Sequence, residues 1–107
     1  ILWHISNEFS GECRCETCCA SFRQWLKNRY GSLEDLNRRW WTPFWSHQYD
    51  CWEEILPPSP LGEQNLPSLD LDWKRFCTDQ CASFLRMERA ALKKYSDLPA
   101  TTNLMWN

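Results

Sequence analysis

The sequence predicts an α/β fold built on a βαβ unit, in which two parallel strands flank a helical connection. Residues 2–6 form a short apolar run bounded by polar residues, and residues 100–105 are apolar and β-branched, so both segments are predicted strands. The sequence between them has apolar residues at helical spacing. Because a long helical crossover joins the two predicted strands, we expect these strands to be parallel and to be neighbours in one sheet.

Two helices are expected early in the crossover. Residues 18–29 place Phe22, Trp25 and Leu26 at the i, i+3, i+4 spacing, and Gly31 suits the position just after a helix. A short second helix is expected from Ser32 as N-cap to about residue 41, with an acidic residue three positions after the cap in a capping-box-like arrangement.

The segment 43–69 is predicted to be a long loop on the surface. Its apolar residues follow no sustained helical or strand period, and it contains five of the six prolines. Loops of this length are uncommon in compact domains and tend to be functional.

The longest helix is expected near residues 73–95, with Asp70 or Asp72 as its N-cap. Its apolar positions recur at helical spacing. They are Trp73, Phe76, Cys77, Cys81, Phe84, Leu85, Leu92 and Tyr95. Residues 96–99, Ser-Asp-Leu-Pro, predict its end.

Composition excludes several classes of protein. The 107 residues carry 12 Lys and Arg against 14 Asp and Glu, a net charge of −2, which predicts neither nucleic-acid binding nor attraction to an anionic membrane. No apolar run approaches the ~18 residues of a spanning helix, and no basic-then-apolar leader opens the chain, so we expect a cytoplasmic protein.

A two-stranded parallel sheet is not a stable domain, so we expect a piece of a larger one.

The cysteines are unusual because they number seven and four of them fall within seven residues. An odd, clustered set does not fit a secreted disulfide framework. The C-x-C-x-x-C spacing of Cys13, Cys15 and Cys18 brings three thiols close enough to bind one zinc ion. Cys19 is adjacent to the last of these and must point elsewhere, so we expect the fourth ligand outside this chain. Free thiols in a reducing cytosol are the alternative.

The remaining cysteines are expected to pack as small apolar groups. Cys77 and Cys81 lie one helical turn apart, and Cys51 lies in an aromatic stretch.

Asn7 and Glu8 directly follow the first predicted strand. Chemistry in α/β folds gathers at the carboxyl ends of parallel strands. A glutamate there can act as a general acid, and an amide beside it can hydrogen-bond a sugar hydroxyl. A solvated polar pair at a strand end is the alternative. His4, on the strand itself, is expected to be a core histidine rather than a catalyst.

Several motifs occur in a recognisable order along the whole chain. They are Trp3-His4-Ile5-Ser6-Asn7-Glu8-Phe9, Gly11-Glu12-Cys13-Arg14-Cys15-Glu16-Thr17-Cys18, Phe22-Arg23-Gln24-Trp25-Leu26-Lys27, Tyr30-Gly31-Ser32-Leu33, Leu36-Asn37, Trp40, Phe44-Trp45-Ser46 and Thr101-Thr102-Asn103-Leu104-Met105. In this order they resemble the acid/base segment of family-42 glycoside hydrolases, the bacterial β-galactosidases.

The resemblance implies a fold and an activity. The family fold is a TIM (β/α)8 barrel, so residues 1–107 would be its fourth strand, helical crossover and fifth strand, not a complete domain. The whole protein would be a retaining β-galactosidase acting on terminal β-D-galactosides. Glu8 would be the general acid/base, and Asn7 would bind the hydroxyl next to the anomeric carbon. The nucleophile, about 5–5.5 Å from the acid, comes from a later strand, so the isolated chain is expected to be inactive.

The resemblance also implies partners. Cys13, Cys15 and Cys18 would hold a structural zinc whose fourth cysteine comes from an earlier segment. Trp45 would lie in a loop that shapes the sugar site, contributed in some members by an adjoining subunit of a trimer; packing within the aromatic loop is the alternative. The expected partners are the β-galactoside, the rest of the barrel and further copies of the chain, with no nucleic acid and no membrane.

A different class of function stays open, namely a small zinc-stabilised interaction module. Its site would be closed by Cys19 or Cys51, and its Trp-rich loop would be a binding surface. A redox module based on the Cys15–Cys18 C-x-x-C pair is a third possibility, although the helix context typical of thioredoxin is missing.

Overall fold

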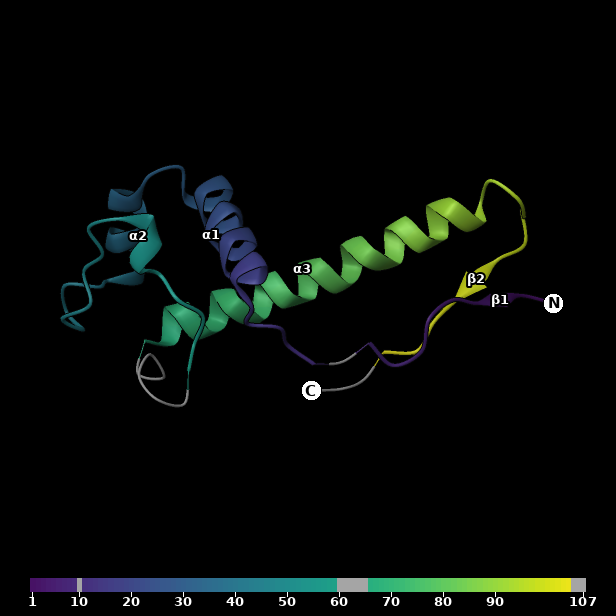
Figure 1. Cartoon of the computed structure of the whole chain (residues 1–107), viewed down its shortest axis with the longest axis horizontal. Helices are drawn as coiled ribbons and strands as arrows, with labels where there is room; N and C mark the ends of the chain where they lie inside the picture. The colour runs from purple at the N-terminus through teal and green to yellow at the C-terminus, as the bar shows by residue number, and fades with distance from the viewer. Residues whose placement is uncertain (10, 60–65, 105–107) are drawn as a thin grey trace. The chain divides into compact units, whose positions relative to one another are not determined.

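The computed structural model describes residues 1–9, 11–59 and 66–104 (Figure 1). The elements in order are β1 (Trp3–His4), α1 (Glu16–Tyr30), α2 (Leu33–Trp40), the 3-10 helix η1 (Trp52–Glu54), α3 (Pro67–Leu92) and β2 (Ala100–Thr101). The chain forms two compact units, one of Ile1–Glu12 with Cys77–Asn107 and one of Cys13–Phe76. Within the described residues, no helix has both the length and the apolar content that spanning a bilayer requires.

The first unit contains the predicted parallel strand pair. Trp3 pairs with Ala100 and His4 with Thr101, so the expected βαβ order with neighbouring parallel strands is confirmed (Figure 1). Both strands are much shorter than the runs 2–6 and 100–105 predicted. The ladder breaks because Ser6 has a left-handed backbone, with φ 56°, and an extended strand cannot continue through that conformation.

Pairing resumes beyond the break, where Phe9 forms an isolated parallel bridge with Leu104. Between the two paired regions, residues 5–8 of the first segment stand opposite only residues 102 and 103 of the second. The first segment therefore bulges, as strands often do beside functional sites. Met105, the last residue of the second predicted strand, lies outside the described residues.

Large apolar side chains of the strand segments are exposed. Leu2, Trp3 and Leu104 are 56%, 47% and 68% exposed. Parallel sheets are normally covered on both faces, so these strands require further elements against them, as the sequence predicts. His4 is also exposed, which contradicts the expectation of a core histidine.

The second unit begins with two helices close to their predicted bounds. α1 starts two residues earlier than expected and ends at Tyr30. The next residue, Gly31, has a φ of 77°, and its N–H donates to Lys27 O at 2.9 Å. α2 follows with Ser32 as its N-cap, and the Ser32 hydroxyl accepts a bond from the Asp35 N–H at 3.1 Å. The predicted cap is therefore confirmed.

The core of this unit is aromatic and aliphatic. The Phe22 ring of α1 meets Trp73 edge-on at 5.1 Å and lies 5.3 Å from the Phe76 ring of α3. The fully buried side chains of this unit come from α1, α2, α3 and the segments before α3. They include Leu26, Leu36, Ile55, Leu66 and Leu69.

α3 begins at Pro67, six residues earlier than predicted, so the loop 43–69 is shorter at its C-terminal end. Proline is favourable at the first helical position because its missing N–H would be unpaired there in any case. The segment is also not uniformly on the surface, since Ile55, Pro57 and Pro58 are buried.

Asp70 and Asp72 therefore lie inside the helix and do not cap it. Asp72 is only 1% exposed, and its Oδ2 accepts bonds from Tyr30 Oη at 2.5 Å and Trp40 Nε1 at 3.0 Å. Its other oxygen accepts a bond from Arg75 at 3.0 Å. The sequence favoured a cap here, but the carboxylate instead ties α1, α2 and α3 together.

The later part of the predicted apolar stripe of α3 is less buried than expected. Phe84 is 44% exposed, and Tyr95 lies beyond the helix end and is 89% exposed. Cys77 and Cys81 are half-buried rather than core residues, and Cys51 is exposed, contrary to prediction.

Candidate functional site

Glu8 and Asn7 lie in the bulge after β1, at the carboxyl end of the strand, and both side chains are exposed. Glu8 has a left-handed backbone with φ 51°, and Ser6, two residues earlier, has φ 56°. Non-glycine residues adopt this conformation rarely, and such strain is concentrated at functional sites. The structure therefore aims a carboxylate and an amide outward from a strained turn.

Contacts from α3 and from the end of β2 hold this turn. The Ser6 hydroxyl donates to Glu88 of α3, and the Ser6 carbonyl accepts a bond from Thr102 Oγ1 at 3.5 Å. The Phe9 ring meets Phe84 of α3 edge-on at 5.4 Å. The turn is thus anchored on both sides of Glu8.

The Glu8 carboxylate itself is contacted by a residue that the sequence analysis did not assign to the site. Asn103 Nδ2 donates to Glu8 Oε1 at 3.4 Å. The signal was present in the sequence, because Asn103 follows the second predicted strand and neighbouring parallel strands place their carboxyl ends together.

Cys13, Cys15 and Cys18 come together at the start of α1. Their sulfur atoms all lie within 4.8 Å of one another. Three thiolates around one tetrahedral zinc, at Zn–S distances near 2.3 Å, would be about 3.8 Å apart, so the thiol cluster fits such an ion. The sequence placed these three residues together correctly.

The start of α1 favours a thiolate in this cluster. Cys15 is the N-cap, and interaction with the Cys18 backbone N–H, followed by the Cys13 and Cys18 thiols, lowers the pKa of Cys15 to about 7. Hydrogen bonds with the Cys13 and Cys15 sulfurs raise the pKa of Cys18 to about 12. Of these two thiols, Cys15 is therefore the one that ionises more readily, and a thiolate is the form that binds a metal ion.

No fourth thiol joins the cluster in the described part of the chain. Cys19 is buried and its sulfur contacts the Arg14 carbonyl at 3.5 Å, while burial raises its pKa. Cys51 is exposed but is not a member of the cluster. A closed four-thiol module using Cys19 or Cys51 is therefore not favoured.

Trp45 lies in an exposed group of aromatic rings that follows α2. Trp41 and Phe44 stack with centroids 4.7 Å apart and planes 11° from parallel, and Trp45 meets Phe44 edge-on at 5.1 Å. Trp45 is 39% exposed, and Trp41 and Phe44 are more exposed. This second unit therefore presents an exposed aromatic surface, the kind of surface on which sugars and partner proteins pack.

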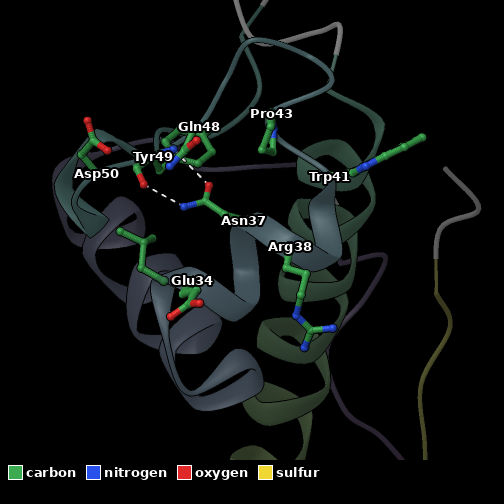
Figure 2. Close-up of a pocket in the computed structure, with 9 residues that line it drawn as sticks. Glu34, Asn37, Arg38, Trp41, Pro43, Gln48, Tyr49 and Asp50 are labelled. Carbon is green, nitrogen blue, oxygen red and sulfur yellow. Dashed lines mark hydrogen bonds between the residues drawn. The ribbon is translucent and has the colours of Figure 1, made fainter.

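A pocket of about 500 Å³ lies beside this surface, between α2 and residues 41–50 (Figure 2). Asn37 points into it, but its amide group is engaged with the chain itself. Asn37 Nδ2 donates to Tyr49 O at 2.7 Å, and its Oδ1 accepts from Tyr49 N at 3.0 Å and Thr42 Oγ1 at 2.7 Å. Of the candidate site residues in the described segments, none lines this pocket.

A parallel strand pair with a carboxylate at its carboxyl end is the arrangement of many α/β enzymes. The family model of glycoside hydrolase family 42, described as beta-galactosidase, matches residues 1–107. The chain belongs to this family.

Its relatives are close in sequence and structure. The chain is 52% identical over 107 residues to Beta-galactosidase GanA of Bacillus subtilis, covering 98% of this chain and 16% of GanA. It is 53% identical over 106 residues to Beta-galactosidase BglY of Alicyclobacillus acidocaldarius, covering 98% of this chain and 15% of BglY.

Solved structures of beta-galactosidases also match this chain. The cold-adapted beta-galactosidase from Rahnella sp. R3 matches with a TM-score of 0.93 and 53% identity, over 98% of this chain and 16% of that one. The beta-galactosidase from Bacillus circulans sp. alkalophilus matches with a TM-score of 0.91 and 46% identity, over 97% and 16%. The chain thus spans about 16% of the length of these enzymes.

Proposed function

We propose that this chain is the acid/base segment of a retaining β-galactosidase that hydrolyses terminal β-D-galactosides. The observation that carries the proposal is Glu8, a solvent-exposed carboxylate in a left-handed turn at the carboxyl end of a parallel strand. Membership of family 42 supplies the reaction class. In this proposal β1 and β2 are the fourth and fifth strands of a (β/α)8 barrel.

Glu8 has two roles in the proposed reaction. It first donates its proton to the glycosidic oxygen while a carboxylate from another part of the protein attacks the anomeric carbon, so that the bond to the leaving group breaks as the new C–O bond forms. Glu8, now ionised, then takes a proton from the water that hydrolyses the galactosyl-enzyme. Asn7, beside it, donates a hydrogen bond to the hydroxyl next to the anomeric carbon.

The isolated 107-residue chain is proposed to be inactive. A retaining reaction needs a second carboxylate about 5–5.5 Å from the first. The carboxylates of Glu53, Glu54 and Asp70 lie on the helical elements η1 and α3 rather than at the end of a strand, and Glu63 lies outside the described residues. The nucleophile is therefore assigned to a segment beyond these residues.

The thiol cluster is proposed to bind a structural zinc ion. Cys13, Cys15 and Cys18 would supply three sulfur ligands, and the fourth would come from elsewhere in the whole protein. Such a site stabilises the fold and takes no part in the hydrolysis, because a closed tetrahedral zinc has no position for substrate. We further propose a homo-oligomer, a trimer, in which Trp45 and its aromatic neighbours help to shape the sugar site. A cytoplasmic location fits reduced thiols at this site.

The test uses the full-length protein that carries this segment, with Glu8→Gln as the variant and phenyl β-galactoside as the substrate. Loss of a general acid lowers kcat/KM by about 10²–10⁴-fold. Glu53→Gln, which removes an exposed carboxylate of η1, is the matched control and keeps full activity. With 2,4-dinitrophenyl β-galactoside, added azide restores turnover of Glu8→Gln because azide attacks the galactosyl-enzyme without a base. A Glu8→Gln enzyme that keeps the kcat/KM of the wild type on the phenyl substrate contradicts the proposal.

A further inference from the structure

We propose that Asn103 is a positioning residue that orients the Glu8 carboxyl group for proton transfer. This inference rests on the proposed role of Glu8 as the acid/base. Among residues 1–9, 11–59 and 66–104, Asn103 is the one whose side chain hydrogen-bonds the Glu8 carboxylate, with 3.4 Å between Nδ2 and Oε1. Catalytic hydrogen bonds are often long without substrate and shorten in the reacting complex.

Glu8 needs such a partner because, in the described part of the chain, Asn103 makes the side-chain hydrogen bond that restrains the end of its side chain. The residue is exposed, and its backbone is left-handed with a φ of 51°. A flexible, solvent-exposed glutamate samples many rotamers, whereas proton transfer requires the carboxyl group within hydrogen-bond reach of the glycosidic oxygen. A bond to one carboxylate oxygen removes most of that freedom.

Asn103 is itself held on both sides. Thr102 Oγ1 donates to the Ser6 carbonyl at 3.5 Å, and Leu104 forms the parallel bridge with Phe9. These two contacts lie on either side of Glu8 along the first segment. The amide of Asn103 is therefore delivered to Glu8 from a backbone that the neighbouring strand already fixes, which is the kind of support that a preorganised site requires.

The amide group also suits a residue that changes protonation state during each turnover. A primary amide N–H can donate to Oε1 whether Glu8 is ionised or carries its proton on Oε2, because the donor needs only a free acceptor oxygen. A lysine or arginine at the same place would favour the ionised form alone and oppose the acid step. Asn103 therefore holds the geometry through both steps and leaves the second oxygen for the reaction.

The experiment compares Asn103→Leu with wild type in the full-length protein, on two substrates that differ in their need for a general acid. Phenyl β-galactoside needs protonation of its leaving group, and 2,4-dinitrophenyl β-galactoside needs little. We expect kcat/KM to fall about fivefold to tenfold on the phenyl substrate, the effect of losing one hydrogen bond to a carboxyl group that carries its proton in this step. On the dinitrophenyl substrate the fall is less than threefold.

Three further variants separate the possible outcomes. Asn103→Ala is measured in parallel because it adds no apolar bulk, and Asn28→Leu, the same change at an exposed position of α1, is the matched control. Equal losses on both substrates, or no loss on either, overturn the role of Asn103. Glu8→Gln tests the proposed function separately. If Glu8→Gln loses the same activity on both substrates, the acid/base role of Glu8 is wrong. If it loses much more on the phenyl substrate, that role stands, and the Asn103 variants then test the Asn103 inference alone.

Discussion

Replacing Asp72 with alanine is expected to loosen the whole second unit, because this buried carboxylate joins three helices. Its Oδ2 accepts the Tyr30 hydroxyl at 2.5 Å and Trp40 Nε1 at 3.0 Å, and its Oδ1 accepts Arg75 at 3.0 Å. Asp72 is 1% exposed, so its carboxylate depends on these partners rather than on water.

The magnitude follows from the buried partners. Removing the acceptor of a buried donor costs about 1–3 kcal/mol. The Tyr30 hydroxyl loses its acceptor, and the Trp40 N–H loses one of its two acceptors. Trp40 Nε1 also lies 3.0 Å from Tyr30 Oη and keeps that bond, which moderates the loss. Arg75 is 47% exposed and can turn to solvent. We therefore expect a loss of about 3 kcal/mol in the free energy of local unfolding.

Hydrogen–deuterium exchange in the full-length protein measures this change where it occurs. A loss of about 3 kcal/mol corresponds to roughly 100-fold faster exchange of α1 and α2 amides that open with this unit. Asp70→Ala is the matched control, because Asp70 is 42% exposed and pairs across the helix surface with Lys74 at 2.7 Å, a contact worth about 0.5 kcal/mol. If Asp72→Ala and Asp70→Ala accelerate exchange equally, the reasoning about the buried carboxylate is wrong.

Three more predictions concern the caps, the thiols and pH. Ser32→Ala removes the acceptor of the Asp35 N–H, and faster exchange in the first turn of α2 should report a loss of about 1 kcal/mol, which Ser32→Thr would largely avoid. Cys15→Ser should lower the zinc content of the purified full-length protein, measured by mass spectrometry of the metal, whereas Cys51→Ser should leave it unchanged; equal zinc in both contradicts the site. Burial raises the pKa of Tyr30 above its ordinary value near 10. The stability that the Tyr30 hydroxyl contributes is therefore complete below pH 10 and is lost as the pH rises through the pKa of the folded state. Tyr30→Phe should therefore be less stable at pH 7 but show a flatter decline above pH 10 in denaturation midpoints, and an unchanged alkaline decline would contradict this.

Local signals predicted much of the chain correctly. The cap at Ser32 and the helix end at Gly31 depend on short-range backbone geometry, which neighbouring residues determine. The three clustered cysteines had to meet because they lie within six residues of one another. The parallel strand pair followed from the order of elements.

The start of α3 shows where such signals fail. Asp70 and Asp72 are good caps in isolation, yet the helix extends back to Pro67 because Leu66 and Leu69 are buried in the core. The energy of burying these side chains exceeds that of a cap, and it is visible only when the rest of the unit is in place.

For the candidate site, the sequence by itself determined which groups are present: a carboxylate and an amide after a strand, three thiols before a helix, and membership of family 42. Only the tertiary structure decided that Glu8 lies in a strained bulge and that Asn103, 95 residues away, donates to it. Residue types and short spacings are encoded locally. A bond between distant segments depends on the register of two strands, which is set by long-range pairing and packing.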